Sequence, residues 1–148
     1  MAPINEASSC RVVEAQPGTS DVIATLLPAY LAELGVVEPY PYLALYFVEK
    51  DRYPFLFILG DDVAGFALVR YHSQSATFEL AEFYVRPPFR HRGFGASAVN
   101  VLLARFNGKW QIGVDIANVR ALAFWRKMLP PPVSEQLICS GQRCIFSL

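Results

Sequence analysis

The stretch ELAEFYVRPPFRHRGFGASAVNVLLARF, residues 79–106, decides the fold of this chain. Its first part is rich in apolar and aromatic residues and predicts a β-strand over residues 76–85. Two prolines follow and end the strand, because proline has no N–H group to donate to a sheet. From Gly93 onward the apolar residues fall at helical spacing: Val99, Leu102, Leu103 and Phe106. The stretch therefore predicts a strand that enters a helix through a glycine-containing turn.

This glycine turn, Arg90-His91-Arg92-Gly93-Phe94-Gly95-Ala96, has the composition of an anion-binding site. The first turn of a helix has N–H groups without intrahelical partners, and these groups favour a phosphate together with the helix dipole. Gly93 and Gly95 lack the side chains that would block a pyrophosphate, while Arg90 and Arg92 can add charge-assisted contacts. His91 is expected to face solvent or a phosphate. We therefore expect the turn to hold a pyrophosphate.

The rest of the chain predicts a single α/β (α+β) domain over residues 1–148. The chain has 148 residues, of which 53% are hydrophobic, and this is enough for one sizeable core. Expected strands span residues 10–15, 53–59, 63–72, 76–85, 109–117, 133–140 and 142–148. Expected helices span residues 17–34, 38–50 and 93–107, and a last helix starts after Asn118. The order β-α-α-β-β-β-α-β-α-β-β indicates a mixed sheet whose first half is antiparallel.

Composition excludes several classes of protein. The formal net charge is zero, whereas nucleic-acid-binding domains are strongly basic, so we expect no nucleic-acid partner. The run from Arg86 to Lys109 contains no acid, which fits a small phosphorylated ligand better. No apolar run reaches membrane-spanning length, and the start shows no signal-peptide pattern. Cys10, Cys139 and Cys144 are expected to be reduced and buried, which favours a cytoplasmic protein.

The same stretch resembles motif A of the GNAT N-acetyltransferase superfamily. Residues Arg90 to Gly95 match that family's (Arg/Gln)-x-x-Gly-x-(Gly/Ala) signature, and NVRALAFWRKM, residues 118–128, resembles its motif B. The expected element order is also similar, so the resemblance covers nearly the whole chain. It implies a GNAT-like fold in which the fourth and fifth strands splay apart and hold the pantetheine arm of acetyl-CoA between them.

The resemblance also assigns residues to acetyl-CoA. The backbone of Phe83, Tyr84 and Val85 would hydrogen-bond the pantetheine arm as an extra strand does, and the N–H groups from Arg92 to Ala96 would hold the pyrophosphate. Asn118, Phe124 and Trp125 would flank the pantetheine and the thiol end. Two alternatives stay open here: Asn118 can be a plain helix cap, and the two aromatic residues can be core packing.

Acetyl transfer to an amine requires a base, and two carboxylates are candidates. Glu79 and Glu82 lie on the strand that would line the thioester. Plain alternation would place them on opposite faces of the sheet, whereas a bulge, which the family commonly has in this strand, would change that. The sequence leaves open which glutamate faces the substrate.

The thiolate that leaves has no obvious proton donor. Many family members place a tyrosine seven residues after the motif-B asparagine, but that position is Trp125 here. The indole N–H donates hydrogen bonds but does not release its proton at these pH values. Water, Tyr84 or Tyr71 are the alternatives, and Tyr84 is the candidate catalytic acid among the site residues.

The acceptor site is expected at the aromatic segment EPYPYLALYF, residues 38–47, with Tyr40, Tyr42 and Tyr46 as substrate-binding residues. Aromatic rings beside carboxylates suit an amine, although the rings could equally be core. His72 and His91 are too separated to predict a metal site. The expected function is acetyl-CoA-dependent N-acetyl transfer to a primary amine of a small molecule or peptide by direct attack. By family habit, a homodimer is possible.

Two other functions compete with this interpretation. Gly93-x-Gly95-x-x-Ala98 with Asp115 downstream formally fits a dinucleotide-binding fingerprint. That fingerprint normally opens a run of parallel β-α units, and a strand meander precedes it here, which argues against an oxidoreductase. A non-catalytic acyl-CoA-binding or regulatory module on the same fold is the second alternative, because the expected tyrosine is missing.

Overall fold

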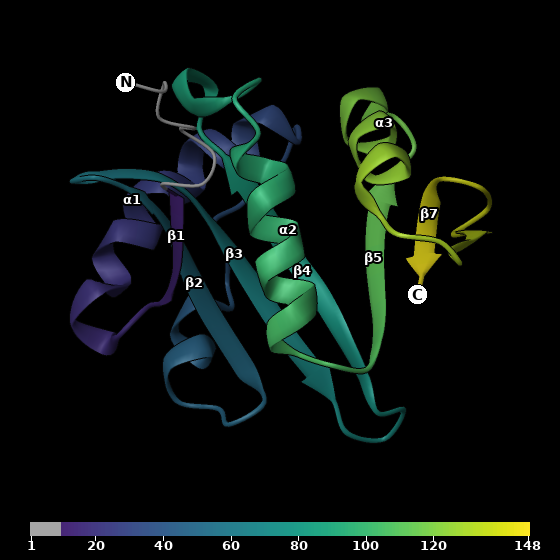
Figure 1. Cartoon of the computed structure of the whole chain (residues 1–148), viewed down its shortest axis with the longest axis horizontal. Coiled ribbons are helices and arrows are strands. Elements are labelled where there is room, and N and C mark those ends of the chain that lie inside the picture. The colour runs from purple at the N-terminus through teal and green to yellow at the C-terminus, as the bar shows by residue number, and fades with distance from the viewer. Residues whose placement is uncertain (1–9) are drawn as a thin grey trace, which may run out of the picture.

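The computed structural model describes residues 10–148. The expectation that the start of the chain has no signal peptide concerns residues 1–9, which lie outside the described residues. The described chain forms one mixed seven-stranded sheet in the order β1-β2-β3-β4-β5-β7-β6 (Figure 1). Its strands are β1 (Cys10–Glu14), β2 (Arg52–Leu59), β3 (Asp62–His72), β4 (Thr77–Val85), β5 (Lys109–Asp115), β6 (Ser134–Ile138) and β7 (Arg143–Ser147). Its α-helices are α1 (Ser20–Glu33), α2 (Phe94–Arg105) and α3 (Val119–Met128).

The pairing confirms the predicted mixed topology. Strands β1 to β4 form an antiparallel meander, and β6 and β7 form an antiparallel hairpin beside β5. Among the strands of residues 10–148, β4 and β5 alone pair in parallel, and the crossover helix α2 joins them. The strand–turn–helix–strand unit that the sequence predicts therefore lies at the centre of the sheet.

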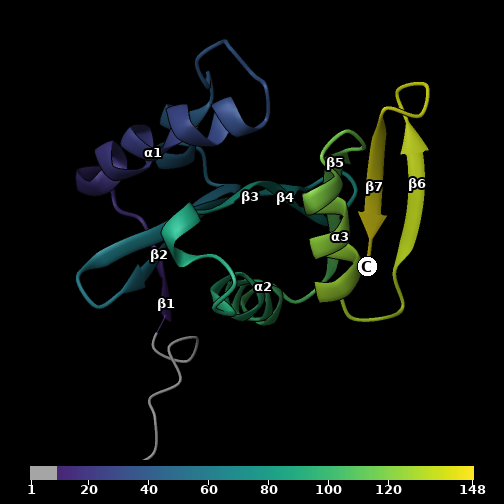
Figure 2. The same cartoon turned by 90° about the horizontal axis from the view of Figure 1, so that it is seen from above.

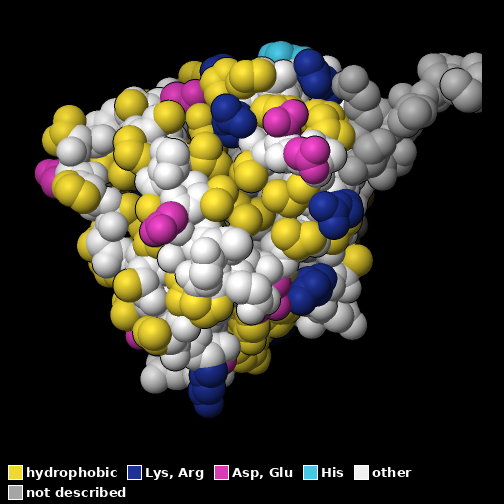
Figure 3. Space-filling model, turned by 90° about the vertical axis from the view of Figure 1, so that its left-hand side faces the viewer, with side chains coloured by type: hydrophobic (Ala, Val, Ile, Leu, Met, Phe, Trp, Pro, Cys, Tyr) yellow, Lys and Arg dark blue, Asp and Glu magenta, His cyan; other side chains and the backbone are white. Residues whose placement is uncertain are grey.

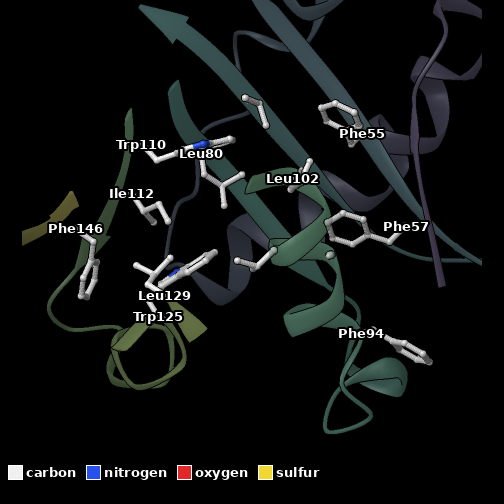
Figure 4. Close-up of a cluster of buried hydrophobic side chains, with 14 of the residues drawn as sticks. Phe55, Phe57, Leu80, Phe94, Leu102, Trp110, Ile112, Trp125, Leu129 and Phe146 are labelled. Carbon is white, nitrogen blue, oxygen red and sulfur yellow. The ribbon is translucent and has the colours of Figure 1, made fainter. Parts of the chain in front are cut away.

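Helices cover both faces of the sheet, with α1 on one side and α2 and α3 on the other (Figure 2). We call these sides the α1 face and the α2 face. On the α1 face, Ile23, Leu27 and Tyr30 of α1 pack against Phe66 and Leu68 of β3. The larger core lies on the α2 face, where Trp125 and Leu129 meet Ile112 of β5 and Phe146 of β7 (Figure 4).

The two central strands stay together over only a short length. Thr77, Phe78 and Glu79 of β4 pair with Lys109, Trp110 and Gln111 of β5, and the register ends there. Beyond this point the strands diverge toward the end of the sheet where α2 begins (Figure 1). We call the diverging part, residues 80–85 and 112–115, the β4–β5 fork. It confirms the expected splaying of the fourth and fifth strands and leaves backbone groups on the inner edges of both.

A bulge in β4 changes which side chains share a face. Leu68 of β3 lies opposite Glu82, but the next residue, Val69, lies opposite Leu80, so Ala81 is the extra residue. Leu80 packs in the α2-face core, whereas Leu68 packs in the α1-face core. Glu79 and Glu82 therefore both point to the α1 face, and the open question of alternation is settled by the bulge.

Two expectations from the sequence are wrong. The helix expected over residues 38–50 is only a 3-10 helix, η3 (Leu43–Phe47). Pro39 and Pro41 explain its late start, because the residue before a proline is disfavoured in helical conformation. Cys139 is exposed in the turn between β6 and β7 at a positive φ of 53°, although Cys10 and Cys144 are buried as expected. Strand β6 and helix α1 otherwise lie close to their predicted positions.

The surface is mixed in charge. On the face toward the viewer in Figure 3, acidic and basic side chains are interspersed with apolar ones. Within residues 10–148, no helix is long and apolar enough to cross a membrane.

Candidate functional site

The first turn of α2 offers backbone donors toward the β4–β5 fork. Gly93 is the N-cap in the left-handed conformation with φ of 83°, which explains a glycine at this position. No side chain caps the helix, and the first intrahelical bond runs from the N–H of Ser97 to the carbonyl of Gly93. The N–H groups of Phe94, Gly95 and Ala96 precede that bond and point outward from the helix end. The start of α2 therefore presents three consecutive backbone N–H groups.

The basic residues of the glycine turn have separate roles. Arg90 does not point freely into solution: its Nη2 lies 2.9 and 2.7 Å from the two carboxylate oxygens of Glu33, and its Nε donates to the carbonyl of Val85 at 2.8 Å. It therefore ties the end of α1 to the end of β4. His91 is exposed at a positive φ of 62°, and the Arg92 guanidinium lies 5.9 Å from the ring centre of Phe89.

Three aromatic rings lie across the β4–β5 fork on the α2 face. Phe83 of β4 stacks with Phe124 of α3 at 5.8 Å between ring centres and meets Trp125 edge-on at 5.2 Å. Trp125 is only 5% exposed and belongs to the core. Phe124 is partly buried and reaches Gly95, where a Cβ would lie 3.1 Å from its ring. The rings thus connect β4, α3 and the start of α2 around the place expected for the pantetheine arm.

Asn118 acts as a helix cap in this structure. Its Oδ1 accepts a hydrogen bond of 3.1 Å from the N–H of Ala121 at the start of α3. This is the simpler of the two roles open from the sequence, and it leaves the side-chain NH₂ group as the part that could reach a ligand.

Glu82 is the central carboxylate of the α1 face. The hydroxyl of Tyr30, on α1, donates a hydrogen bond to its Oε2. Burial raises the pKa of Glu82 above its ordinary value, the Tyr30 hydrogen bond opposes this, and the neighbouring Glu79 charge adds to it. A carboxylate with a raised pKa binds a proton more readily than an ordinary glutamate does, which suits a general base.

Glu79 lies beside Glu82 in a more exposed setting. Nε2 of His72 lies 2.9 Å from Oε1 of Glu79, and both side chains are 35% exposed. The hydrogen bond is one in which the ring N–H donates to the carboxylate. Glu79 therefore lies at the solvent side of the carboxylate pair.

Tyrosines from two segments surround this carboxylate pair. Tyr40 and Tyr46 share a hydrogen bond, and their hydroxyls interact electrostatically with Glu82 and Glu79, respectively. Burial raises the pKa of both tyrosines. Tyr42 lies farther out, 51% exposed, and packs edge-on against Tyr40 at 5.7 Å. Two of the three expected acceptor residues thus lie at the carboxylates, and the third lies at the rim.

The two candidate acids lie on opposite faces of the sheet. Tyr84 is 4% exposed and packs at 5.4 Å from Tyr30 under α1, where burial raises its pKa. Tyr71 packs on Phe78 of the α2-face core at 4.7 Å. The sequence had not indicated Tyr30, because a tyrosine at helical spacing on an apolar face is typical of core packing.

The family model for the GNAT family of acetyltransferases matches residues 21–129, most of the chain. The chain belongs to the GNAT acetyltransferase family. The match includes β4, the glycine turn, α2, β5 and α3, which together form the fork and its donors. A search of curated proteins found no match.

Solved structures share this GNAT fold at low sequence identity. An acetyltransferase from Thermus thermophilus superimposes with a TM-score of 0.77 at 19% identity, covering 95% of this chain and 96% of that one. The ribosomal-protein-S18-alanine N-acetyltransferase from Escherichia coli gives 0.67 at 15%, covering 94% and 92%. The spermidine/spermine N-acetyltransferase from Vibrio cholerae gives 0.70 at 13%, covering 95% and 94%. The named acceptors are a protein amine and polyamines, so the shared fold does not select the acceptor.

Proposed function

We propose that this GNAT protein transfers the acetyl group of acetyl-CoA to a primary amine by direct attack. The observation that carries the proposal is the β4–β5 fork, which has helix donors at its wide end and a carboxylate of raised pKa at its base. One end suits a pyrophosphate, and the other suits an amine that must lose a proton.

The residues present fit acetyl-CoA. The N–H groups of Phe94, Gly95 and Ala96 would hold the pyrophosphate, and the absent side chain of Gly95 leaves the approach open between Phe124 and Val85. The inner edge of β4 at Phe83 and Tyr84 would pair with the pantetheine amides, since β5 has left that edge. Bound there, acetyl-CoA supplies an acetyl thioester at the base of the fork.

Glu82 is the proposed base, with Tyr30 as its positioning residue. In the reaction the amine nitrogen forms a bond to the acetyl carbon, the bond from that carbon to sulfur breaks, and the amine proton passes to Glu82. Tyr30 holds the carboxylate in one orientation, and Glu79 returns the proton to solvent. The coenzyme A thiolate is a stable leaving group, so water can protonate it without a tyrosine at position 125.

The test measures thiol release from acetyl-CoA with a panel of polyamines, amino sugars, amino acids and peptide N-termini. Glu82→Gln is expected to lower kcat by about 100- to 10,000-fold, the usual contribution of a general base. Glu79→Gln is expected to have a smaller effect. Glu14→Gln is the matched control, because Glu14 forms only an exposed ion pair with Arg105 at 3.1 Å.

Calorimetry with coenzyme A distinguishes the two ways in which this proposal can fail. Tight binding without turnover on any amine would favour the non-catalytic acyl-CoA-binding module on the same fold. Absence of binding by folded protein would contradict the assignment of the fork itself. Turnover that is unchanged in Glu82→Gln would contradict the assigned base.

A further inference from the structure

The side chain of Arg143, at the start of β7, lies over the backbone of β5 because Gly113 has no side chain there. A Cβ atom at Gly113 would lie 2.3 Å from Nη2 of Arg143 and 3.3 Å from its Cζ. Any other residue at position 113 would therefore displace the guanidinium. The neighbours of Arg143 along β7, Cys144 and Phe146, belong to the α2-face core. Because Cys144 follows directly and side chains alternate along a strand, Arg143 lies on the α1 face.

The guanidinium of Arg143 thus shares a face with the two carboxylates, on the other side of the fork. Its positive charge opposes the rise in the pKa of Glu82. Arg52 forms an ion pair with Glu49 at 2.6 Å, and Arg90 forms one with Glu33 at 2.7 Å, whereas Arg70 of β3 lies opposite Glu79, on the β3 side of the carboxylates and not across the fork. Within residues 10–148, no carboxylate forms such an ion pair with Arg143. The base of the fork therefore has carboxylates on one side and a guanidinium on the other.

We propose that Arg143 binds a carboxylate carried by the acceptor, so that the acceptor is an amino acid. The proposal rests on the proposed function and names its substrate class. The amine would lie at Glu82 and Glu79, and the carboxylate would lie at Arg143, whose planar guanidinium donates two parallel hydrogen bonds to a carboxylate. A zwitterion matches the charges of both sides.

Charge also distinguishes this ligand from other anions and from polyamines. One guanidinium opposes a single negative charge, and the nearby glutamates would repel a phosphate dianion. A polyamine would bring a second positive charge toward Arg143, where the two would repel each other. The structure thus favours a monoanionic group on the acceptor.

The experiment compares each of several amino acids with the amine that lacks its carboxylate, such as phenylalanine with phenethylamine. A charge-assisted hydrogen bond contributes about 1.5–3 kcal/mol, so we expect wild-type kcat/KM to favour the amino acid by roughly 10- to 150-fold. Arg143→Met should abolish this preference. Gly113→Ala should reduce it as well, because the new methyl group displaces the guanidinium while its charge remains.

Arg11→Met is the matched control. It removes an exposed arginine from β1, at the opposite end of the sheet order, and should leave the preference unchanged. The pH profile provides a further readout. If Arg143 only influenced Glu82, Arg143→Met would shift the profile for both members of a pair and leave their ratio unchanged, which would overturn the proposal.

The failure of this inference is separable from the failure of the proposed function. Equal turnover of amino acid and matching amine leaves the transferase intact and overturns the role of Arg143. If no amine of the panel is acetylated, the proposed function fails. Calorimetry with phenylalanine and the coenzyme A complex then tests the carboxylate site by itself. Heat of binding in the wild type that Arg143→Met lacks supports the carboxylate site, and absence of heat in both overturns it.

Discussion

Replacing Gly95 by valine should separate binding of coenzyme A from folding. Gly95 is the second residue of α2 and has a helical backbone, so valine costs the helix no more than glycine does. A Cβ there would lie 3.1 Å from the ring of Phe124 and 3.7 Å from Cγ2 of Val85. The ring is partly exposed and can shift by the few tenths of an ångström that this requires. The fold should therefore be kept.

Binding should weaken, because the valine methyl groups stand where a phosphate would approach the N–H groups. Loss of one charge-assisted hydrogen bond costs about 1.5–3 kcal/mol, which corresponds to roughly 10- to 150-fold in Kd. Gly95→Ala adds one methyl group and should show a smaller increase. Isothermal titration with coenzyme A measures both, and thermal unfolding should show a shift of no more than about 4 °C, which is near 1 kcal/mol for a chain of this size.

Ala104→Val is the matched control, since it places the same side chain on an exposed position of α2, away from the glycine turn. It should leave the Kd unchanged. If folded Gly95→Val binds coenzyme A as wild type does, the first turn of α2 does not hold the pyrophosphate. Equal weakening in both variants would also refute the reasoning, because the effect would then belong to the helix as a whole.

Three further predictions concern the α1 face and the sheet. Tyr30→Phe removes a hydrogen bond that holds the pKa of Glu82 down, so the acid limb of kcat/KM should move to higher pH; an unmoved limb would show that Glu82 is not the titrating group. Because the pKa of Glu82 is raised in the folded state, the protein loses stability as pH rises through that pKa and the carboxylate becomes charged. Glu82→Gln removes this loss, so it should raise Tm at pH 8 more than at pH 4 in scanning calorimetry. Gly65→Ala would place a Cβ 1.9 Å from the carbonyl oxygen of Tyr84, and because backbone cannot yield, the free energy of unfolding should fall by about 3 kcal/mol or more in urea titrations.

The sequence predicted the fold well where pattern determines structure. Residues 76–117 have strand and helix periods with prolines and glycines between them, and this unit formed as expected at the centre of the sheet. The short helix expected over residues 38–50 is reduced to η3, because Pro39 and Pro41 keep the residues before them out of helical conformation. Local sequence patterns determine such elements, and a proline within a pattern limits the element that can form.

The candidate site was less predictable, because it depends on long-range positions. The bulge at Ala81 puts Glu79 and Glu82 on one face, and the sequence of the strand does not predict where the bulge lies. Tyr30 reaches Glu82 from a helix that is distant in sequence. Arg143 becomes notable only when β7 lies beside Gly113 of β5. Each of these contacts is set by pairing or packing rather than by neighbouring residues.

The brief contact between β4 and β5 has a mechanical consequence. Three residue pairs join the backbone of β1–β4 to that of β5–β7, so this junction is the weakest seam in the described sheet. A molecule that bridges the seam restrains both halves at once. Amide exchange should therefore slow on occupancy not only beside the ligand but also in the terminal hairpin, which would gain its rigidity from across the sheet.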